Sequence, residues 1–148
     1  MKNFFLAAVL TLTVFTGALA TETSIVNKAV IFSFNKEFKK ASEISWVTRG
    51  DYAKAVFTMN NEKMEAFYKF NGDWIATSKQ IQLDDIPVAA KRIFARRYQD
   101  YTVKEAILFT TPEETSYYIS ANNDKESVIL KVDENEQLSL YNRTRQRN

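Results

Sequence analysis

The spacing of apolar residues changes from a helical period to a strand period twice along the chain, and this order constrains the fold more than any other feature. Apolar residues at i, i+3, i+4 and i+7 spacing predict one helix over residues 25–41 and another over residues 86–99. Alternation of apolar and polar residues after each helix predicts strands over residues 44–48, 52–59, 64–70, 74–83, 103–110, 115–121, 127–132 and 137–141. The sequence therefore predicts two helices, each followed by four short strands.

Short turns between the expected strands indicate antiparallel pairing, because a tight turn reverses the chain. Asn71-Gly72 is a strong hairpin signal, and Asp84, Asp85 and Pro87 are typical of a helix start. We expect an α+β fold built as a tandem repeat of one helix plus a four-stranded antiparallel sheet, with repeat units at about residues 25–83 and 84–141. In this arrangement the helices pack on one sheet face and leave the other face open, and two such units side by side could form a longer sheet with both helices behind it.

The first twenty residues predict export. Lys2 precedes an apolar run from Phe4 to Phe15, and Ala18-Leu19-Ala20 matches a signal-peptide cleavage site. We expect residues 1–20 to be removed and residues 21–148 to form one domain that ends in a basic tail at residues 142–148. The protein should then be periplasmic or secreted, with no stable membrane insertion after cleavage.

The composition excludes several kinds of chemistry. The chain has no His and no Cys, which removes Ser-His-Asp and Cys-His nucleophiles, disulfides and the usual zinc sites. Twenty basic and 18 acidic residues give a formal charge of only +2, which offers no global field for nucleic acid. We expect no catalytic residues, no metal, no cofactor and no enzymatic activity, although catalysis by carboxylate or tyrosine side chains alone stays open.

The strand alternation identifies candidate binding residues. Ala53, Ala55, Phe57, Met64, Ala66, Tyr68 and Phe70 should face a helix. The open face should then carry Tyr52, Val56, Phe67, Tyr118, Ile129 and Tyr141. Aromatic side chains among mixed charges suit a protein-binding surface, and they are also consistent with ordinary cross-strand pairs, which alone would explain them.

The side chain of Trp74 can point to either face. A two-residue turn would put it beside Phe67, whereas a three-residue turn would send it into the helix-facing core, which we favour.

Several short aromatic motifs resemble a known family. They are Phe34-x3-Phe38, Trp46, Tyr52-Ala53-x-Ala55-x-Phe57, Ala66-Phe67-Tyr68, Asn71-Gly72-Asp73-Trp74, Ile86-Pro87 and Ile93-x4-Tyr98. Over residues 25–141 the chain resembles the PepSY-like, β-lactamase-inhibitor-like family of exported bacterial proteins. The resemblance implies tandem helix-plus-four-strand units and a non-catalytic binding role, and the related β-lactamase inhibitor protein grips its enzyme with the open sheet face.

We therefore expect an exported, non-catalytic binding module. Its open sheet face would engage a protein or peptide of the cell envelope, and restraint of a hydrolase is one form of this role. The alternative is a carrier of small apolar ligands with a pocket between helix and sheet, or a structural or stress-related envelope protein.

Overall fold

The structure, a computed structural model, describes residues 26–145, and it contains every helix and strand that the sequence predicts. The predicted signal segment at residues 1–20 and the last residues of the tail, 146–148, lie outside the described residues. The elements run in the order α2 (Lys28–Glu37), β1 (Ser42–Arg49), β2 (Tyr52–Met59), β3 (Glu62–Lys69), β4 (Trp74–Ile81), the short 3-10 helix η1 (Leu83–Asp85), α3 (Val88–Arg97), β5 (Thr102–Thr110), β6 (Thr115–Asn122), β7 (Glu126–Val132) and β8 (Leu138–Arg145).

The strands form one sheet, and the predicted tandem repeat of a helix plus a four-stranded sheet is wrong. All eight strands pair in sequence order from β1 to β8, each antiparallel to the next. At the centre, β4 pairs with β5 from Thr77↔Thr110 to Ile81↔Ala106. Two separate sheets would have left the N–H and C=O groups of β4 and β5 unpaired at two further edges, and the direct pairing satisfies them.

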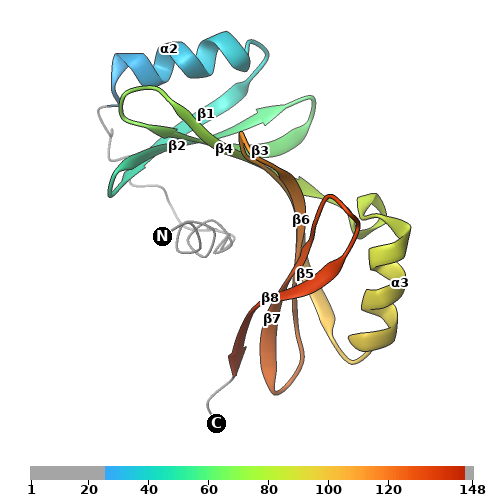
Figure 1. Cartoon of the computed structure of the whole chain (residues 1–148). Coiled ribbons are helices and arrows are strands. Elements are labelled where there is room, and N and C mark those ends of the chain that lie inside the picture. Colours follow the sequence, from blue (N-terminus) through green and yellow to red (C-terminus); the bar gives the residue numbers. More distant parts are fainter. Residues whose placement is uncertain (1–25, 146–148) are drawn as a thin grey trace.

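The sheet is strongly twisted and curved, and both helices lie on its convex side (Figure 1). Figure 1 shows α2 over the first strands and α3 beside the last strands, with the concave side of the sheet facing away from both. A sheet of this length cannot stay flat, because each strand is rotated relative to its neighbour by the right-handed twist. The curvature therefore separates a helix-covered convex face from a concave face.

The first core lies between α2 and the strands β1–β4. Asn27 caps the helix, since its side-chain oxygen accepts a hydrogen bond from the N–H of Ala29 (3.0 Å). Phe34 lies 5.0 Å from Phe57 in an edge-to-face contact, measured between ring centroids. The other buried members are Val30, Phe38, Ala53, Ala55, Ala66 and Tyr68. Alanines on the strands leave room for the aromatic rings of the helix.

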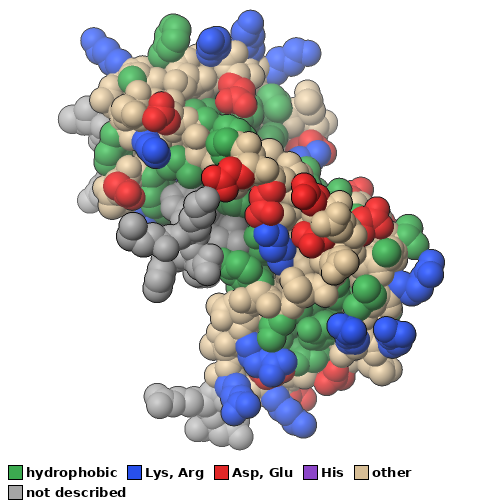
Figure 2. All heavy atoms as spheres, viewed as in Figure 1, with side chains coloured by type: hydrophobic (Ala, Val, Ile, Leu, Met, Phe, Trp, Pro, Cys, Tyr) green, Lys and Arg blue, Asp and Glu red, His purple; other side chains and the backbone are tan. Residues whose placement is uncertain are grey.

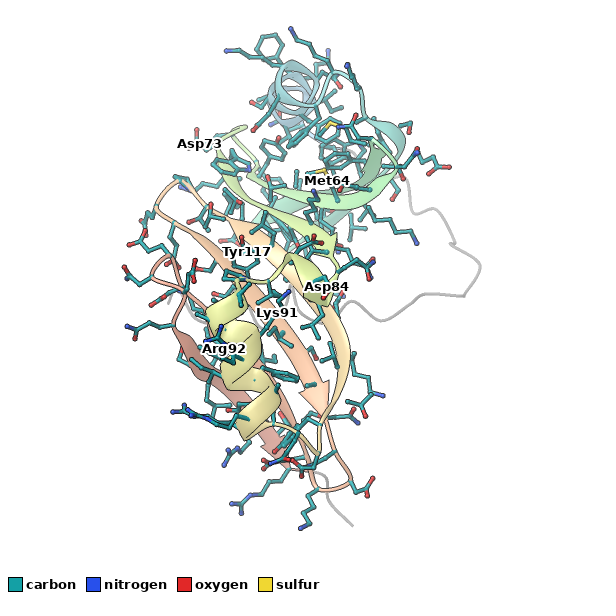
Figure 3. All side chains as sticks on the ribbon, turned by 90° about the vertical axis from the view of Figure 1, so that its right-hand side faces the viewer. Met64, Asp73, Asp84, Lys91, Arg92 and Tyr117 are labelled. Carbon is teal, nitrogen blue, oxygen red and sulfur yellow. The ribbon has the colours of Figure 1, made fainter. Side chains whose placement is uncertain are left out.

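The second core lies between α3 and the strands β5–β8. Pro87 stands at the N-cap position of α3. The short helix η1 before it begins with a capping box, in which the carboxylate of Asp85 accepts a hydrogen bond from the N–H of Gln82 (2.9 Å). Figure 3 shows Lys91 beside Asp84, and the Lys91 ammonium donates to the Asp84 carbonyl oxygen (2.9 Å). The buried residues of this core include Ile86, Ala90, Phe94, Ile119, Val128, Leu130 and Val132.

The turn after β3 brings Trp74 into the first core and leaves Phe70 outside it. Trp74 pairs with Tyr68 and packs against the first core, as favoured from the sequence, and its indole N–H donates to Thr77 Oγ1 (3.0 Å). The expectation that Phe70 faces the helix is wrong, because this residue lies in the turn beyond β3 and is 39% exposed.

Candidate functional site

The concave face of the sheet carries a third apolar cluster. Its buried members are Phe67, Ala76, Ile107, Phe109 and Tyr118, and its partly buried members are Tyr52, Ile75, Ile129 and Tyr141. We call these nine residues the concave cluster. Every member lies on a strand, from β2 to β8, whereas each of the two cores takes residues from a helix. The cluster crosses the β4–β5 pairing and so joins the two halves of the sheet.

The structure brings together five of the six binding residues predicted from the sequence. Tyr52, Phe67, Tyr118, Ile129 and Tyr141 all belong to the concave cluster. The sixth residue, Val56, pairs with Glu65 and is half-buried, and it is not a member of the cluster. That these side chains bind a partner stays a prediction.

Burial differs among the predicted residues. We call the buried ones the floor of the concave cluster and the half-buried ones its margin. Phe67 is 1% exposed and Tyr118 is 3% exposed, whereas Tyr52, Ile129 and Tyr141 are half-buried. The sequence interpretation treated all of them alike as open-face residues. Strand position accounts for the difference, since β3 and β6, which carry Phe67 and Tyr118, lie nearer the centre of the sheet than β2, β7 and β8.

Aromatic rings in the concave cluster meet edge to face. The ring centroids of Phe109 and Tyr118 are 6.1 Å apart at 88°, and those of Tyr118 and Tyr141 are 5.4 Å apart at 86°. Burial, with smaller contributions from Glu114 and Tyr141, raises the pKa of the Tyr118 hydroxyl, which therefore stays protonated.

The pairing of the eight described strands has four irregularities, none of them predicted, and two of these direct apolar residues to the concave cluster. Phe67 pairs with Ala76 while Tyr68 pairs with Trp74, so Ile75 is an extra residue on β4. In the same way Ile129 pairs with Asn142 while Leu130 pairs with Leu140, so Tyr141 is an extra residue on β8. A β-bulge of this kind redirects a side chain. Strict alternation along a sequence cannot show it.

Sequence reasoning also missed Ile107 and Phe109 on β5. The sequence shows that they alternate with Leu108. In the structure Ile107 pairs with Tyr118, and Phe109 pairs with Ser116. The signal that identifies them is the register of β5 with β6, which the sequence does not state.

A partly satisfied carboxylate lies beside the concave cluster. The Lys54 ammonium donates to Glu65 Oε1 (2.8 Å) and lies 6.0 Å from the centre of the Phe67 ring. Glu65 is only 7% exposed, and its Oε2 is buried without a hydrogen-bond partner. A buried carboxylate oxygen normally accepts at least one hydrogen bond, so Glu65 has unused capacity to bind a donor.

Glu105 is a second carboxylate on the concave face. It pairs with Ser120, two residues along β5 from the buried Ile107. Burial, with a smaller contribution from the charge of Glu65, raises the pKa of Glu105 to about 7. Within residues 26–145 no hydrogen bond or ion pair joins the Glu105 side chain to another group.

Other kinds of site find no support in the described part of the chain. Among residues 26–145 no three Asp or Glu side chains gather as metal ligands do. None of the helices that the structure describes is long and apolar enough to cross a membrane. Two surface hollows flank α3, one lined by Ala89, Arg92, Ile93 and Arg96 and the other by residues from Leu83 to Tyr101. Neither hollow is the pocket between helix and sheet that an apolar-ligand carrier would need.

Comparison with known proteins identifies the fold. No protein-family model matches the sequence, and no curated protein matches it significantly. Among solved structures, a BLIP-like protein from Bacteroides fragilis has a TM-score of 0.70 at 20% identity, over 82% of this chain and 87% of that one. A protein from Bacteroides eggerthii that is proposed to be periplasmic has a TM-score of 0.73 at 18% identity, over 81% and 88% of the two chains. A DUF2874 family protein from Bacteroides ovatus has a TM-score of 0.70 at 20% identity, over 80% and 86%.

These likenesses show that the chain has a BLIP-like fold. They agree in fold with the β-lactamase-inhibitor-like part of the resemblance found in the sequence, and its PepSY-like part is not shown.

Proposed function

We propose that the protein is an exported, non-catalytic binding module whose concave sheet face seats a segment of a protein or peptide in the cell envelope. The observation that carries this proposal is the concave cluster itself, an apolar and aromatic cluster built from strands alone on the side of the sheet away from both helices.

The chemistry of the cluster suits protein recognition. Tyr52 and Tyr141 at its margin each combine a large ring with a polar hydroxyl, a composition that is enriched at the centres of protein interfaces. Buried rings behind them, Phe67 and Tyr118, give the surface a rigid floor. Restraint of a hydrolase by such docking is the form of this role that the resemblance suggests.

Export is supported by two independent observations. The first twenty residues have the composition of a signal peptide, and one structural neighbour is a proposed periplasmic protein. We propose that the chain acts in the periplasm or outside the cell. The BLIP-like neighbour and the lack of His and Cys in the sequence support a role without catalysis.

The test is a cross-linking pull-down from envelope extract, with matched variants of the exported protein. Tyr141→Ala removes a half-buried ring at the margin of the concave cluster, and Phe32→Ala removes a ring of α2 that is 72% exposed on the other side of the sheet. A partner captured by the wild type and by Phe32→Ala, but lost from Tyr141→Ala, supports the proposal. Equal capture by all three proteins contradicts it.

Phe67 and Tyr118 are unsuitable for this test. Both side chains are almost fully buried, and replacing a buried aromatic ring by Ala typically costs about 3–5 kcal/mol of stability. Loss of capture in those variants would not separate binding from folding.

A further inference from the structure

Glu65 Oε2 and Ser116 Oγ are buried oxygens on the concave face that have no hydrogen-bond partner, and of the two only Glu65 carries a charge. Lys54 engages only Oε1, and Oε2 is buried beside the concave cluster with no donor. A buried acceptor without a donor loses its hydration and gains nothing in return, which typically costs about 1–3 kcal/mol. A ligand that supplies a donor at this position recovers that free energy.

The carboxylate charge of Glu65 favours a cationic donor over a neutral one, because charged donors make the strongest hydrogen bonds to carboxylates. Glu65 and Glu105 bring two carboxylates to the concave face, near enough for the charge of Glu65 to act on Glu105. Lys54 is the ammonium paired with Glu65, and Glu105 has no ion pair among residues 26–145. Lys63 lies two residues from Glu65 on the same face of β3, so carboxylates and ammonium groups balance here, and the preference rests on the unpaired oxygen of Glu65 and not on an excess of negative charge.

Charge is unevenly distributed over the molecule as a whole. Figure 2 shows acidic side chains gathered across the middle of the visible face, between the two helices, while most Lys and Arg side chains lie toward the two ends of the molecule. A basic group that approaches the molecule from this side meets a favourable potential, which affects the rate of encounter.

We propose that the partner segment places an arginine or lysine side chain on Glu65 Oε2 and an adjoining apolar side chain against the concave cluster. This inference rests on the proposed function and specifies the chemistry of the partner. A charged donor to a carboxylate makes a hydrogen bond about twice as strong as a neutral one. The apolar neighbour covers the margin at Tyr52 and Tyr141 and keeps water away from the new ion pair.

The experiment selects peptides and then tests their basic residue. A displayed library of random short peptides is panned on protein exported from cells that express the full chain, and selected peptides are measured by calorimetry. The protein variants are Glu65→Gln and, as a matched control, Glu62→Gln. Glu62 is an exposed carboxylate on the same strand that pairs with Lys79, and it lies on the opposite face from Glu65.

We expect the selected peptides to share an arginine or lysine next to an apolar residue. Glu65→Gln should weaken their binding by about tenfold or more, and Glu62→Gln should leave it unchanged. Replacing the basic residue of the peptide by Gln should weaken binding to the wild type by a similar factor and should add little to the effect of Glu65→Gln. This substitution alters only the peptide, so the test does not depend on how well the protein variant folds.

The outcomes separate this inference from the proposed function. The inference is overturned if the peptides lose binding to Tyr141→Ala but share no basic residue, or if Glu65→Gln does not change their binding. In both cases the proposed binding module stays in place. Peptides that are insensitive to Tyr141→Ala, or a library that yields no binder, overturn both.

Discussion

Replacing Glu105 by Gln should stabilise the protein at alkaline pH and have little effect at acidic pH. Burial and the nearby Glu65 raise the pKa of the Glu105 carboxyl from 4.5 to about 7 in the folded state. The folded protein therefore binds more protons than the unfolded chain between these two pH values, and its stability falls as the pH rises through that window. The destabilisation is complete above pH 7, and Gln removes it because it carries no charge.

The magnitude follows from the shift. Each pKa unit corresponds to about 1.4 kcal/mol, which sets an upper bound of about 3.4 kcal/mol for this group. Glu105 is only half-buried, and water screens part of the penalty, so we expect a gain of about 1–2 kcal/mol at pH 8. At pH 4.5 the carboxyl is largely protonated in the folded state and Gln differs little from it.

The assay is guanidinium unfolding of the wild type and Glu105→Gln at pH 4.5 and pH 8, with Glu134→Gln as a control. Glu134 is an exposed carboxylate in the turn before β8, so its replacement changes the net charge equally without relieving burial. A stability difference between wild type and Glu105→Gln that is the same at both pH values would refute the reasoning. So would a loss of stability in this variant at pH 8.

Three further substitutions, with Gly50→Ala as a control, test the helix-covered side of the molecule by guanidinium unfolding. Gly72→Ala should cost about 2–4 kcal/mol, because φ is 94° and a Cβ would lie 2.9 Å from the carbonyl oxygen of Ala29. Gly50→Ala, with φ 55° and open space around it, should cost only about 1 kcal/mol, and equal losses would contradict the clash. Tyr68→Phe should leave stability unchanged or raise it by about 1 kcal/mol, because its buried hydroxyl has no partner, and a clear loss would mean that this hydroxyl is bonded. Asn27→Ala should cost about 1 kcal/mol through loss of the α2 cap, and no change would show that the cap is dispensable.

Local periodicity was enough to place the helices and strands. The stripe containing Phe34 and the alternation around Ala55 and Phe57 are properties of neighbouring residues, and they lead directly to α2 and β2. The pairing of β4 with β5 is not local in this sense, because α3 intervenes between them in the chain. Nothing in the sequence distinguishes two sheets of four strands from one sheet of eight.

The candidate site shows the same division. Alternation placed Tyr52, Phe67 and Tyr118 together, because each lies on a regular stretch of strand. The same alternation does not predict Ile75 as a member, because this residue joins the concave cluster through a bulge in β4. It also missed the significance of Glu65, because an unpaired oxygen is a property of three-dimensional surroundings.

The open sheet has two outer strands, β1 and β8, and both are shaped against pairing with a further strand. On β1 the register shifts between Ser42 and Ser45, and Glu43 adopts a positive φ of 52°. On β8 a bulge interrupts the pairing, and two arginines, Arg143 and Arg145, are exposed. Irregular backbone and charge at an edge discourage a neighbouring chain from extending the sheet. Strand addition, which would otherwise be the simplest way for such a protein to polymerise or to capture an extended peptide, is thereby disfavoured at both edges.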